Sequence, residues 1–467
     1  MAKPPLRSVI SGRSERADPA PEELYKGSAD TAAPKPGRLT FAEARKQGVS
    51  GIVRLLGPGL VTGSSDDDPS AIGTYTAVGS QFGLAMLWTP LLTAPLMIAV
   101  QELCARIAHR SGLGLGVVLR RKFPAWLIGP IVFGLLVGNT VTLGADLRAV
   151  AAGGELLTGN RVPALVLIVP VAILVLSFQV FATFTAFFRV LKWLTLVLFA
   201  YVVTAVLVRP ELVQLGASAL IPHFQPSHEY LLALVAVLGA SMTPYLYFWQ
   251  ASSEAEVLTG ASHEKELFDA GVDRSQLNAA RLDIALGMCF AQLIVFCVML
   301  TSGVVLNAHG QTDTETAVQA AAALRPLAGE WASVLFALGL IGTGLLAVPV
   351  LSSSATYALK EFIGFRGSLA VKARYRPAFY AVIVLATAAG VLLNFLHIEI
   401  IRALFLASVI NGLLAAPLLL LLVLAGSDRK LMGEATSGRL SRALTWTATA
   451  LTGAAAIALL IALVSLL

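Results

Sequence analysis

Long apolar runs separated by short polar segments make up most of the chain beyond residue 48. Runs such as 162–180, 193–208 and 443–467 approach the roughly 20 residues that a helix needs to cross the hydrocarbon core of a bilayer. The runs are continuous and do not alternate between apolar and polar positions, which favours helices over the strands of a membrane barrel. The pattern therefore predicts an all-α membrane protein.

The runs predict about eleven transmembrane helices in one domain over 49–467. The first five occupy about 52–208, the next five about 230–425, and the last about 443–467. Residues 1–48 are rich in proline, glycine and charge and lack a long apolar segment, so we expect a disordered cytoplasmic tail there and no signal peptide. The individual spans are expected near 52–80, 84–108, 126–156, 162–187, 190–208, 230–256, 279–305, 331–360, 378–396, 399–425 and 443–467.

Composition agrees with this class of protein. Apolar residues make up 56% of the 467 positions and charged residues only 13%, whereas a soluble domain carries charge on about a quarter of its residues. Mean hydropathy is +0.77. The net charge of +6 does not indicate a nucleic-acid partner, because the basic residues lie in short loops between apolar runs.

The distribution of basic residues predicts the orientation of the chain. Alternate loops are rich in lysine and arginine, whereas the intervening loops, such as 155–162 and 307–330, carry few cations. By the positive-inside rule, the N-terminus is cytoplasmic and the C-terminus is outside, in a bacterial-type inner (plasma) membrane. The basic residues of the four loops are Arg106, Arg110, Arg120, Arg121, Lys122; Arg189, Lys192; Lys360, Arg366, Lys372, Arg374, Arg376; and Arg429, Lys430, Arg439, Arg442.

The motifs of membrane-embedded enzymes are missing from the spans. None of the six histidines lies in the middle of a predicted span, and neither a zinc-protease His-Glu-x-x-His motif nor a Ser/His pair occurs at membrane depth. Cys104, Cys289 and Cys297 lie in or near apolar helices without disulfide or zinc-site spacing, so we expect them to pack as small core residues. We therefore expect no enzymatic activity, no prosthetic group and no obligate protein partner.

Two predicted helices are interrupted in their middle. The first, at 57–73, places three carboxylates and Pro69 at mid-membrane depth, and the sixth, at 239–245, contains Pro244. The two helices are five apart, as an inverted repeat of five plus five helices would place them. Paired interrupted helices at corresponding positions indicate the central binding site of a transporter. A simple packing kink is the alternative for Pro244.

The acidic triplet Asp66, Asp67 and Asp68 is the strongest chemical signal. Carboxylates within a span are costly unless water, a cation or hydrogen-bond donors face them, and successive helical positions point in different directions. Asp68 directly precedes Pro69, where the helix should open, and carboxylate plus carbonyl oxygens suit Mg²⁺, Ca²⁺ or Mn²⁺. The alternative is that the aspartates cap the next half-helix. Both roles are open for Asp67, and Asp66 is expected to face water or to be structural.

The stretch from Gly57 to Trp88, with Asp68-Pro69 inside it, resembles the first-helix signature of the NRAMP divalent-metal transporters. Gln-Glu-Leu-Cys-Ala-Arg at 101–106 and Ser-Gly at 111–112 resemble the family's second helix. The resemblance extends over most of the chain after the tail. It implies the LeuT-type fold with eleven or twelve helices, broken helices one and six, and uptake of Mn²⁺ or Fe²⁺, commonly with protons.

Carried over by position, the family's Asp-Pro-Gly-Asn becomes Asp-Pro-Ser-Ala at 68–71, so the metal-binding Asp is kept and the Asn ligand becomes Ala71. The family's Met-Pro-His on the sixth helix becomes Thr-Pro-Tyr at 243–245, which removes a thioether ligand unless the neighbouring Met242 supplies one. Ala240 falls where the family uses a backbone carbonyl. The resemblance therefore implies a metal site made of Asp68, with a role open for Asp67, and of backbone oxygens near Ser65, Ala240 and Thr243.

These replacements change the expected metal. Loss of the sulfur removes a preference for softer transition metals, and Ala71 in place of Asn enlarges the cavity. Mg²⁺ dehydrates reluctantly and is usually held by one or two carboxylates and waters. The pattern is similar to a distant prokaryotic branch, the NRAMP-related magnesium transporters. We expect a partly hydrated Mg²⁺ or Mn²⁺ between the two broken helices, carried by rocking of the broken-helix bundle.

Proton coupling is expected to be weak or absent. Tyr245 stands where the family has a His, and Asp146 matches one acid of the family's proton route, whereas its second acid is replaced by Ala149. The alternative for Asp146 is an ion pair with Arg148. Asp283, which opens the seventh span, is a candidate for the ion pathway, with a solvated helix end as the simpler interpretation.

Two further polar residues lie inside apolar spans. Asn411 on the tenth span is expected to form a hydrogen bond between helices, with a site role as the alternative. For Gln292 on the seventh span, we expect either a hydrogen bond between helices or a role in the pore.

Three other functions compete with this hypothesis. One is a proton-coupled Mn²⁺/Fe²⁺ transporter of the main NRAMP group. Another is a LeuT-fold carrier of an organic solute, although the cluster Asp66–Asp68 would repel a carboxylate substrate. The last is a channel, which saturable, slow flux would exclude.

Overall fold

The computed structural model describes residues 41–208, 212–225, 227–259, 272–312, 317–396 and 400–465, which form helices joined by turns. Most of the predicted tail lies outside these residues. Its last part is helical and not disordered, because α3 (Phe41–Lys46) lies within it and α4 (Gly48–Leu55) begins at its end.

The helices follow the apolar runs closely. By length and apolar composition, eight spans of the described residues can cross a membrane, or nine if α20 and the bent α21 segment form one. The two remaining predicted spans are α19, which has 17 residues, and the interrupted pair α5–α6. The helices after α4 are α5 (Pro58–Asp66), α6 (Pro69–Phe82), α7 (Thr89–Ser111), α8 (Leu115–Lys122), α9 (Ala125–Leu157), α10 (Ala164–Phe181), α11 (Phe184–Leu194), α12 (Phe199–Leu207), α13 (Leu212–Leu220), α14 (His228–Ser241), α15 (Pro244–Thr259), α16 (Arg274–Val305), α17 (Ala317–Ala328), α18 (Glu330–Ile363), α19 (Pro377–Leu393), α20 (Ile400–Gly426), α21 (Arg429–Met432) and α22 (Arg439–Ser465).

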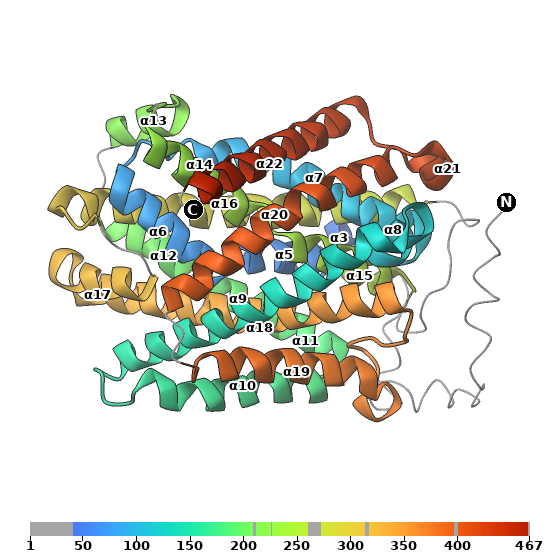
Figure 1. Ribbon diagram of the computed structural model, residues 1–467, viewed down its shortest axis with the longest axis horizontal. Coiled ribbons are helices and arrows are strands. Elements are labelled where there is room, and N and C mark those ends of the chain that lie inside the picture. The colour runs from blue at the N-terminus through green and yellow to red at the C-terminus, as the bar shows by residue number, and fades with distance from the viewer. Residues whose placement is uncertain are drawn as a thin grey trace.

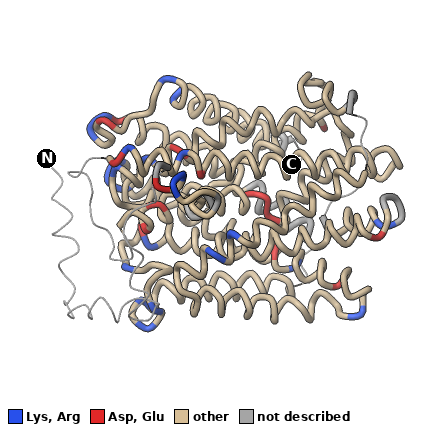
Figure 2. Tube along the Cα trace, turned by 180° about the vertical axis from the view of Figure 1, so that it is seen from behind, with Lys and Arg blue, Asp and Glu red and all other residues tan. Residues whose placement is uncertain are grey.

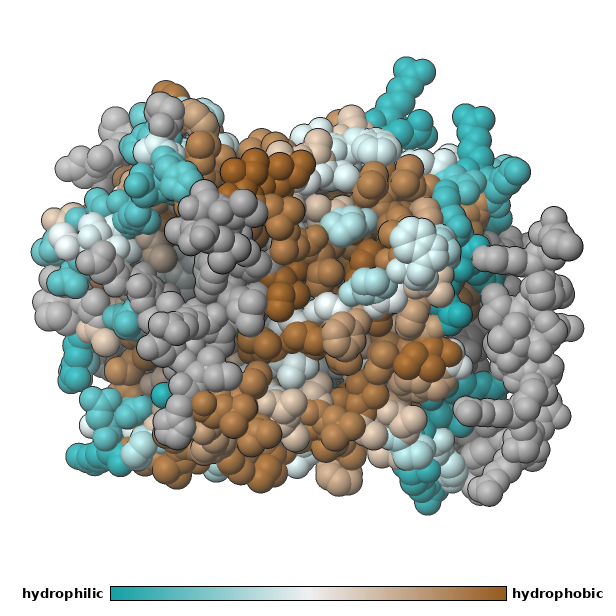
Figure 3. All heavy atoms as spheres, in the orientation of Figure 1, coloured by the Kyte–Doolittle hydropathy of each residue, from teal (hydrophilic) through white to brown (hydrophobic). Residues whose placement is uncertain are grey.

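Most long helices run along the long axis of the molecule (Figure 1). Helices α8 and α21 lie at one end, called here the α8 end, and α13 and α17 lie at the other, the α17 end (Figure 1). Apolar residues cover the middle of the molecule and hydrophilic residues gather toward both ends, as a membrane requires (Figure 3). Lysine and arginine lie mainly toward the ends, whereas a short acidic stretch lies inside (Figure 2).

Glycines hold the first half-helix tightly against the seventh span. A Cβ atom on Gly63 would lie 2.2 Å from the carbonyl oxygen of Gly287, and one on Gly59 would lie 2.6 Å from the backbone nitrogen of Ile284. Helix α5 therefore packs backbone to backbone against α16. The packing also corrects one prediction, because Cys104 and Cys297 are buried but Cys289 is exposed on the outer face of α16.

Candidate metal site

The first span breaks at Asp67 and Asp68. Helix α5 ends at Asp66 and α6 begins at Pro69, whose ring cannot donate a backbone hydrogen bond and forces the preceding residue out of the helical conformation. Asp68 accordingly has φ −66° and ψ 162°, and its side chain caps α6 by accepting a hydrogen bond from Ala71 N at 2.8 Å. The capping role and an open turn therefore coexist at Asp68.

The sixth span breaks at the same depth. Helix α14 ends at Ser241 and α15 begins at Pro244. Thr243 Oγ1 donates to Asp66 Oδ1 at 3.2 Å, and the Tyr75 and Ser241 hydroxyls are 3.1 Å apart. The two interruptions, about 175 residues apart in sequence, thus lie side by side, as paired broken helices of a transporter should.

Tyr245 links the interruption of the sixth span to that of the first span. Its hydroxyl donates to the carbonyl of Ser65 at 2.6 Å and lies 3.4 Å from Asp68 Oδ2. The other Asp68 oxygen, Oδ1, also accepts from the Ser70 hydroxyl at 2.5 Å. Because Oδ1 is held by two short hydrogen bonds and Oδ2 by one long contact, Oδ2 is the oxygen better able to bind a cation.

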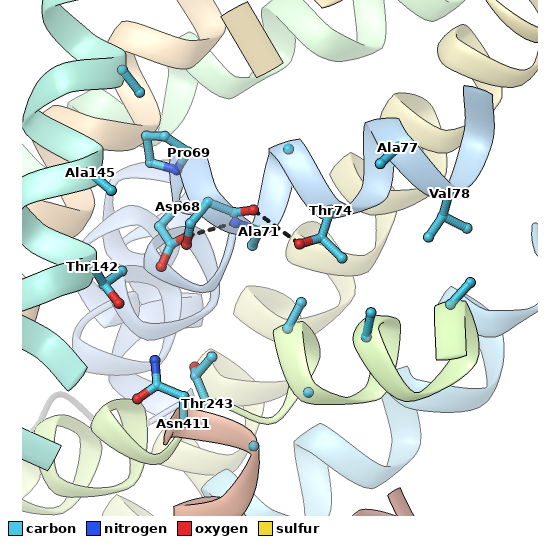
Figure 4. Close-up of a pocket in the computed structure, with 18 of the residues that line it drawn as sticks. Asp68, Pro69, Ala71, Thr74, Ala77, Val78, Thr142, Ala145, Thr243 and Asn411 are labelled. Atoms are coloured by element: carbon cyan, nitrogen blue, oxygen red, sulfur yellow. Dashed lines mark hydrogen bonds between the residues drawn. The ribbon is translucent and has the colours of Figure 1, made fainter. Parts of the chain in front are cut away.

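A cavity of about 1020 Å³ begins at Asp68 and reaches Glu229 and Gln319, which are exposed at the α17 end. Figure 4 shows Asp68 at its inner limit, with Ala71 and Thr74 following on α6 and with Thr142, Thr243 and Asn411 from other helices around it. Ala240 also lines the wall. Of the predicted metal-site residues, Asp68, Ala71, Ala240 and Thr243 therefore face one cavity.

The structure adds Thr142 and Asn411 to these residues. Thr142 is 2% exposed and Asn411 is 7% exposed, yet Thr142 Oγ1 and Asn411 Oδ1 have no hydrogen-bond partner in the protein. Both line the cavity. Asn411 Oδ1 therefore does not form the predicted hydrogen bond between helices, because it faces the cavity beside Gly138 of α9. A polar residue in the middle of an apolar span is the signal that the sequence offered for both.

Other predicted residues do not line the cavity. Ser65 and Asp66 in the last turn of α5, and Asp67 in the bend, are fully buried, and the Ser65 carbonyl accepts a hydrogen bond from Tyr245. Tyr245 is also fully buried and does not line the cavity. Asp146 is buried without a hydrogen-bond partner for either carboxylate oxygen, while its neighbours Ala145, Arg148 and Ala149 face the cavity. The predicted alternative for Asp146, an ion pair with Arg148, is not formed, because neither Asp146 carboxylate oxygen has a partner and residues two apart on a helix do not face each other.

Asp283 has a structural role that both predictions missed. Its carboxylate is fully buried and accepts hydrogen bonds from Gly57 N at 2.9 Å, Gly59 N at 2.8 Å and Leu60 N at 3.0 Å. Asp283 thus caps the N-terminus of α5 and is not a solvated helix end. Three free backbone donors at a helix start, together with the positive end of the helix dipole, explain why a carboxylate is stable there.

Gln292 bridges two helices. Its side-chain oxygen accepts from Thr93 of α7 at 2.7 Å, and its amide nitrogen lies 2.9 Å from Met97 Sδ. This geometry supports the interhelical role for Gln292.

The donor set around Asp68 is sparse. Across the described residues, no three His, Cys, Asp or Glu side chains converge closely enough to hold a metal ion. The cavity wall near Asp68 offers one carboxylate and otherwise neutral oxygens from Thr142, Thr243 and Asn411. Such a wall suits a hard cation that keeps part of its water shell.

Comparison with known proteins decides the family. Residues 59–462 match the family model described as "Natural resistance-associated macrophage protein-like", or Nramp. The chain belongs to the NRAMP family. As a member it is a multi-pass membrane transporter and not an enzyme.

Among NRAMP relatives, the chain is similar to the divalent metal cation transporter MntH of Deinococcus radiodurans, with 28% identity over 338 residues that cover 70% of this chain and 74% of the relative. It is 26% identical to MntH of Klebsiella pneumoniae over 399 residues, covering 84% and 90%.

Solved structures agree on the fold. The Eremococcus coleocola manganese transporter matches with a TM-score of 0.69 at 16% identity, covering 94% of this chain and 91% of that one. Mhp1, a nucleobase-cation-symport-1 transporter, matches with a TM-score of 0.54 and 16% identity, covering 87% and 90%. The predicted LeuT-type NRAMP fold with interrupted first and sixth spans is confirmed.

Proposed function

We propose that this NRAMP protein takes up a partly hydrated divalent cation, Mg²⁺ or Mn²⁺, which Asp68 binds at the inner limit of the cavity. The observation that carries the proposal is the composition of the cavity wall near Asp68: one carboxylate, the neutral oxygens of Thr142, Thr243 and Asn411, and no sulfur ligand at position 243. The relatives named as divalent metal cation transporters, and the solved manganese transporter, support a divalent cargo.

The size and chemistry of the cavity favour a hydrated ion. Ala71 and Thr243 stand where larger ligands occur in the family, and both line a cavity of about 1020 Å³. Asp68 Oδ2 would bind the ion directly, with backbone oxygens near Ala240 and Thr243. The Thr142 hydroxyl and the Asn411 amide would hold the ion's waters. Mg²⁺ fits because it loses water reluctantly and needs few protein ligands. Asp67 and Ser65 drop out of this proposal because they lie outside the cavity.

Weak or absent proton coupling follows from the same region. The residue at the family's His position is Tyr245, whose hydroxyl is committed to Ser65, and Asp146 does not reach the cavity. On α9, the position of the family's second acid is Ala149, which carries no ionisable group. A proton-coupled Mn²⁺/Fe²⁺ transporter remains the competing function.

The direction of transport rests on orientation. By the positive-inside rule, we propose that the α8 end, where the basic loops lie, is cytoplasmic and that the C-terminus is outside. The cavity then opens outward. Toward the α8 end, α15 and α18 are joined by hydrogen bonds from Ser252 to Glu361 at 2.7 Å and from Tyr357 to Glu256 at 2.9 Å, which keep that side closed.

Uptake into proteoliposomes tests the proposal, with Mg²⁺, Mn²⁺ and internal pH recorded for the wild type, Asp68→Asn and the control Asp273→Asn in an exposed loop. The proposal expects saturable Mg²⁺ uptake without acidification, lost in Asp68→Asn and kept in Asp273→Asn. Mn²⁺ uptake with acidification and no competition by Mg²⁺ would establish the proton-coupled function instead.

A further inference from the structure

Arg148 places a positive charge on the wall of the cavity that the transported cation enters. Among the described residues that line this cavity, Arg148 is the one basic side chain, and the other charged ones are Asp68, Glu155 and Glu229. Arg148 lies within the long apolar helix α9. An ionisable group inside a span is costly and generally marks a functional site, so the presence of Arg148 needs an explanation.

The guanidinium of Arg148 is not neutralised by a carboxylate. In the part of the chain that the structure describes, Arg148 takes part in none of the ion pairs. Glu155, further along α9, instead accepts a hydrogen bond from Ala164 N at 2.9 Å. Arg148 is partly exposed and lines the cavity, so its positive charge acts on any ion that enters.

Helix α9 holds Arg148 near the break of the first span. A Cβ atom on Gly344 of α18 would lie 3.2 Å from Pro69 Cγ and 3.5 Å from the carbonyl oxygen of Asp146. The same Cβ atom would lie 2.2 Å from Val150 Cγ2. The turn of α9 that carries Arg148 therefore packs beside the proline that opens the break.

Arg148 lies between the inner part of the cavity and its mouth. Thr142 and Ala145 of α9 appear with Asp68 at the inner limit of the cavity in Figure 4. Helix α9 continues from there toward the α17 end (Figure 1), and six residues correspond to about 9 Å along a helix axis. A cation that enters from the α17 end therefore passes Arg148 before it reaches Asp68.

A fixed positive charge beside the path of a cation lowers the affinity of the site behind it. At about 10 Å in a water-filled cavity, repulsion by one charge corresponds to a several-fold loss of affinity for a divalent ion. The repulsion depends on the charge of the ion and not on its ligand chemistry, so it weakens Mg²⁺ and Mn²⁺ binding by the same factor. Salt reduces the effect, because the Debye length is about 10 Å at 0.1 M ionic strength.

We infer that Arg148 sets the affinity of this transporter, by weakening the binding of divalent cations at Asp68 so that an ion present at high concentration fills the site. The inference rests on the proposed function, since it takes Asp68 as the binding group, and it names the residue that tunes that site. Weak binding also lets the ion leave on the other side of the membrane. An abundant ion such as Mg²⁺ meets this condition, whereas a trace metal requires a tighter site.

Proteoliposome uptake of Mg²⁺ and Mn²⁺ tests the inference, with initial rates measured against ion concentration at low and high ionic strength. Arg148→Gln should lower KM for both ions by the same factor, about five- to tenfold at low ionic strength and much less in high salt. Arg148→Lys keeps the charge and should keep the KM of the wild type. The control Arg161→Gln removes an exposed charge outside the cavity and should leave KM unchanged.

An unchanged or higher KM in Arg148→Gln would overturn the inference, as would a change for one of the two ions alone. A KM of Arg148→Lys equal to that of Arg148→Gln would show that the charge is not what matters. A KM that differs between chloride and gluconate at constant ionic strength would mean that Arg148 binds an anion, which also contradicts the inference. Arg148→Met is the second neutral variant if Arg148→Gln does not give a single size-exclusion peak.

Asp68→Asn separates failure of this inference from failure of the proposed function. If Asp68→Asn abolishes saturable uptake while Arg148→Gln keeps the wild-type KM, the inference fails and the proposed function stands. If saturable uptake survives in Asp68→Asn, the proposed function fails, and the inference fails with it because the ion is not bound at Asp68.

Discussion

The hydroxyl of Tyr245 donates a hydrogen bond to the carbonyl of Ser65 at 2.6 Å. This bond joins the second half of the sixth span to the last turn of α5. Carbonyl groups at a helix end lack partners within the helix, so the bond satisfies one of the acceptors that the break leaves open. Tyr245, which stands where the family has a His, thus links the two interrupted helices through this hydrogen bond.

Removing the Tyr245 hydroxyl should weaken the contact between the two interrupted helices. We expect Tyr245→Phe to lower stability by about 1–3 kcal/mol, the usual effect of leaving a buried acceptor unsatisfied, and to reduce divalent uptake. Thermal unfolding in detergent and proteoliposome uptake measure the two effects. Tyr247→Phe is the matched control, because its buried hydroxyl bonds to Met242 O on its own span. Equal uptake by Tyr245→Phe and the wild type would show that this hydrogen bond is not needed for transport.

Restoring the missing ligands should change the selectivity. The double variant Ala71→Asn, Thr243→Met places an amide oxygen and a thioether on the cavity wall beside Asp68. Sulfur favours softer ions, so Cd²⁺ and Mn²⁺ should compete better against Mg²⁺, by tenfold or more if the new contacts contribute about 1.4 kcal/mol. Ala77→Asn, further along the same wall, is the control for added polarity. An unchanged order of competition in the double variant would locate the metal elsewhere.

The Asp283 cap should be needed for stability. Its carboxylate accepts three backbone hydrogen bonds at the start of α5, and hydrogen bonds to a charged group contribute about 1.5–3 kcal/mol each. We therefore expect Asp283→Ala to lower the melting temperature markedly, and Asp283→Asn, which keeps one acceptor oxygen, to lower it less. A melting temperature of Asp283→Ala equal to that of the wild type would contradict the capping role. The exposed N-cap variant Asp273→Asn serves as the control.

The contribution of the ion pair between Lys122 and Asp428 to stability should depend on pH. A hydrogen bond from the Lys122 ammonium, which lies 2.8 Å away, and one from the backbone amide of Lys430 hold the pKa of Asp428 below its usual range. A lowered folded-state pKa stabilises the protein above the ordinary carboxyl pKa, and that stabilisation is lost as pH falls through the lowered value. The wild type should therefore melt slightly higher than Asp428→Asn at pH 7, with the difference vanishing as pH falls through the lowered pKa of Asp428. A gap that widens toward acid pH would contradict this assignment.

The breaks were predictable because their cause is local. A proline cannot continue the hydrogen-bond ladder and constrains the residue before it, so Asp68-Pro69 and Thr243-Pro244 marked the ends of half-helices from sequence alone. The spans were equally predictable, since each had to supply enough apolar residues to cross the bilayer. Asp68 could be chosen from the triplet by its position before Pro69.

The rest depended on contacts between distant segments. Asp283 caps a helix that begins 225 residues earlier in the chain, and the sequence around Asp283 does not indicate this contact. Asp67 and Asp68 differ only in the direction that the broken turn gives them. Asn411 could be predicted as an unusual polar residue in an apolar span, but only the packing of α20 against α9 shows that it faces the cavity.

The hydration of the bound ion is the most direct test of the central claim. Mn²⁺ bound to the purified protein in ¹⁷O-enriched water can be examined by electron–nuclear double resonance, which counts water ligands. Our interpretation predicts that most of the ion's about six ligands are water, and that Asp68→Asn abolishes the specific signal. A bound ion with mostly protein ligands, or a signal that persists in Asp68→Asn, would contradict the claim that Asp68 binds a hydrated divalent cation.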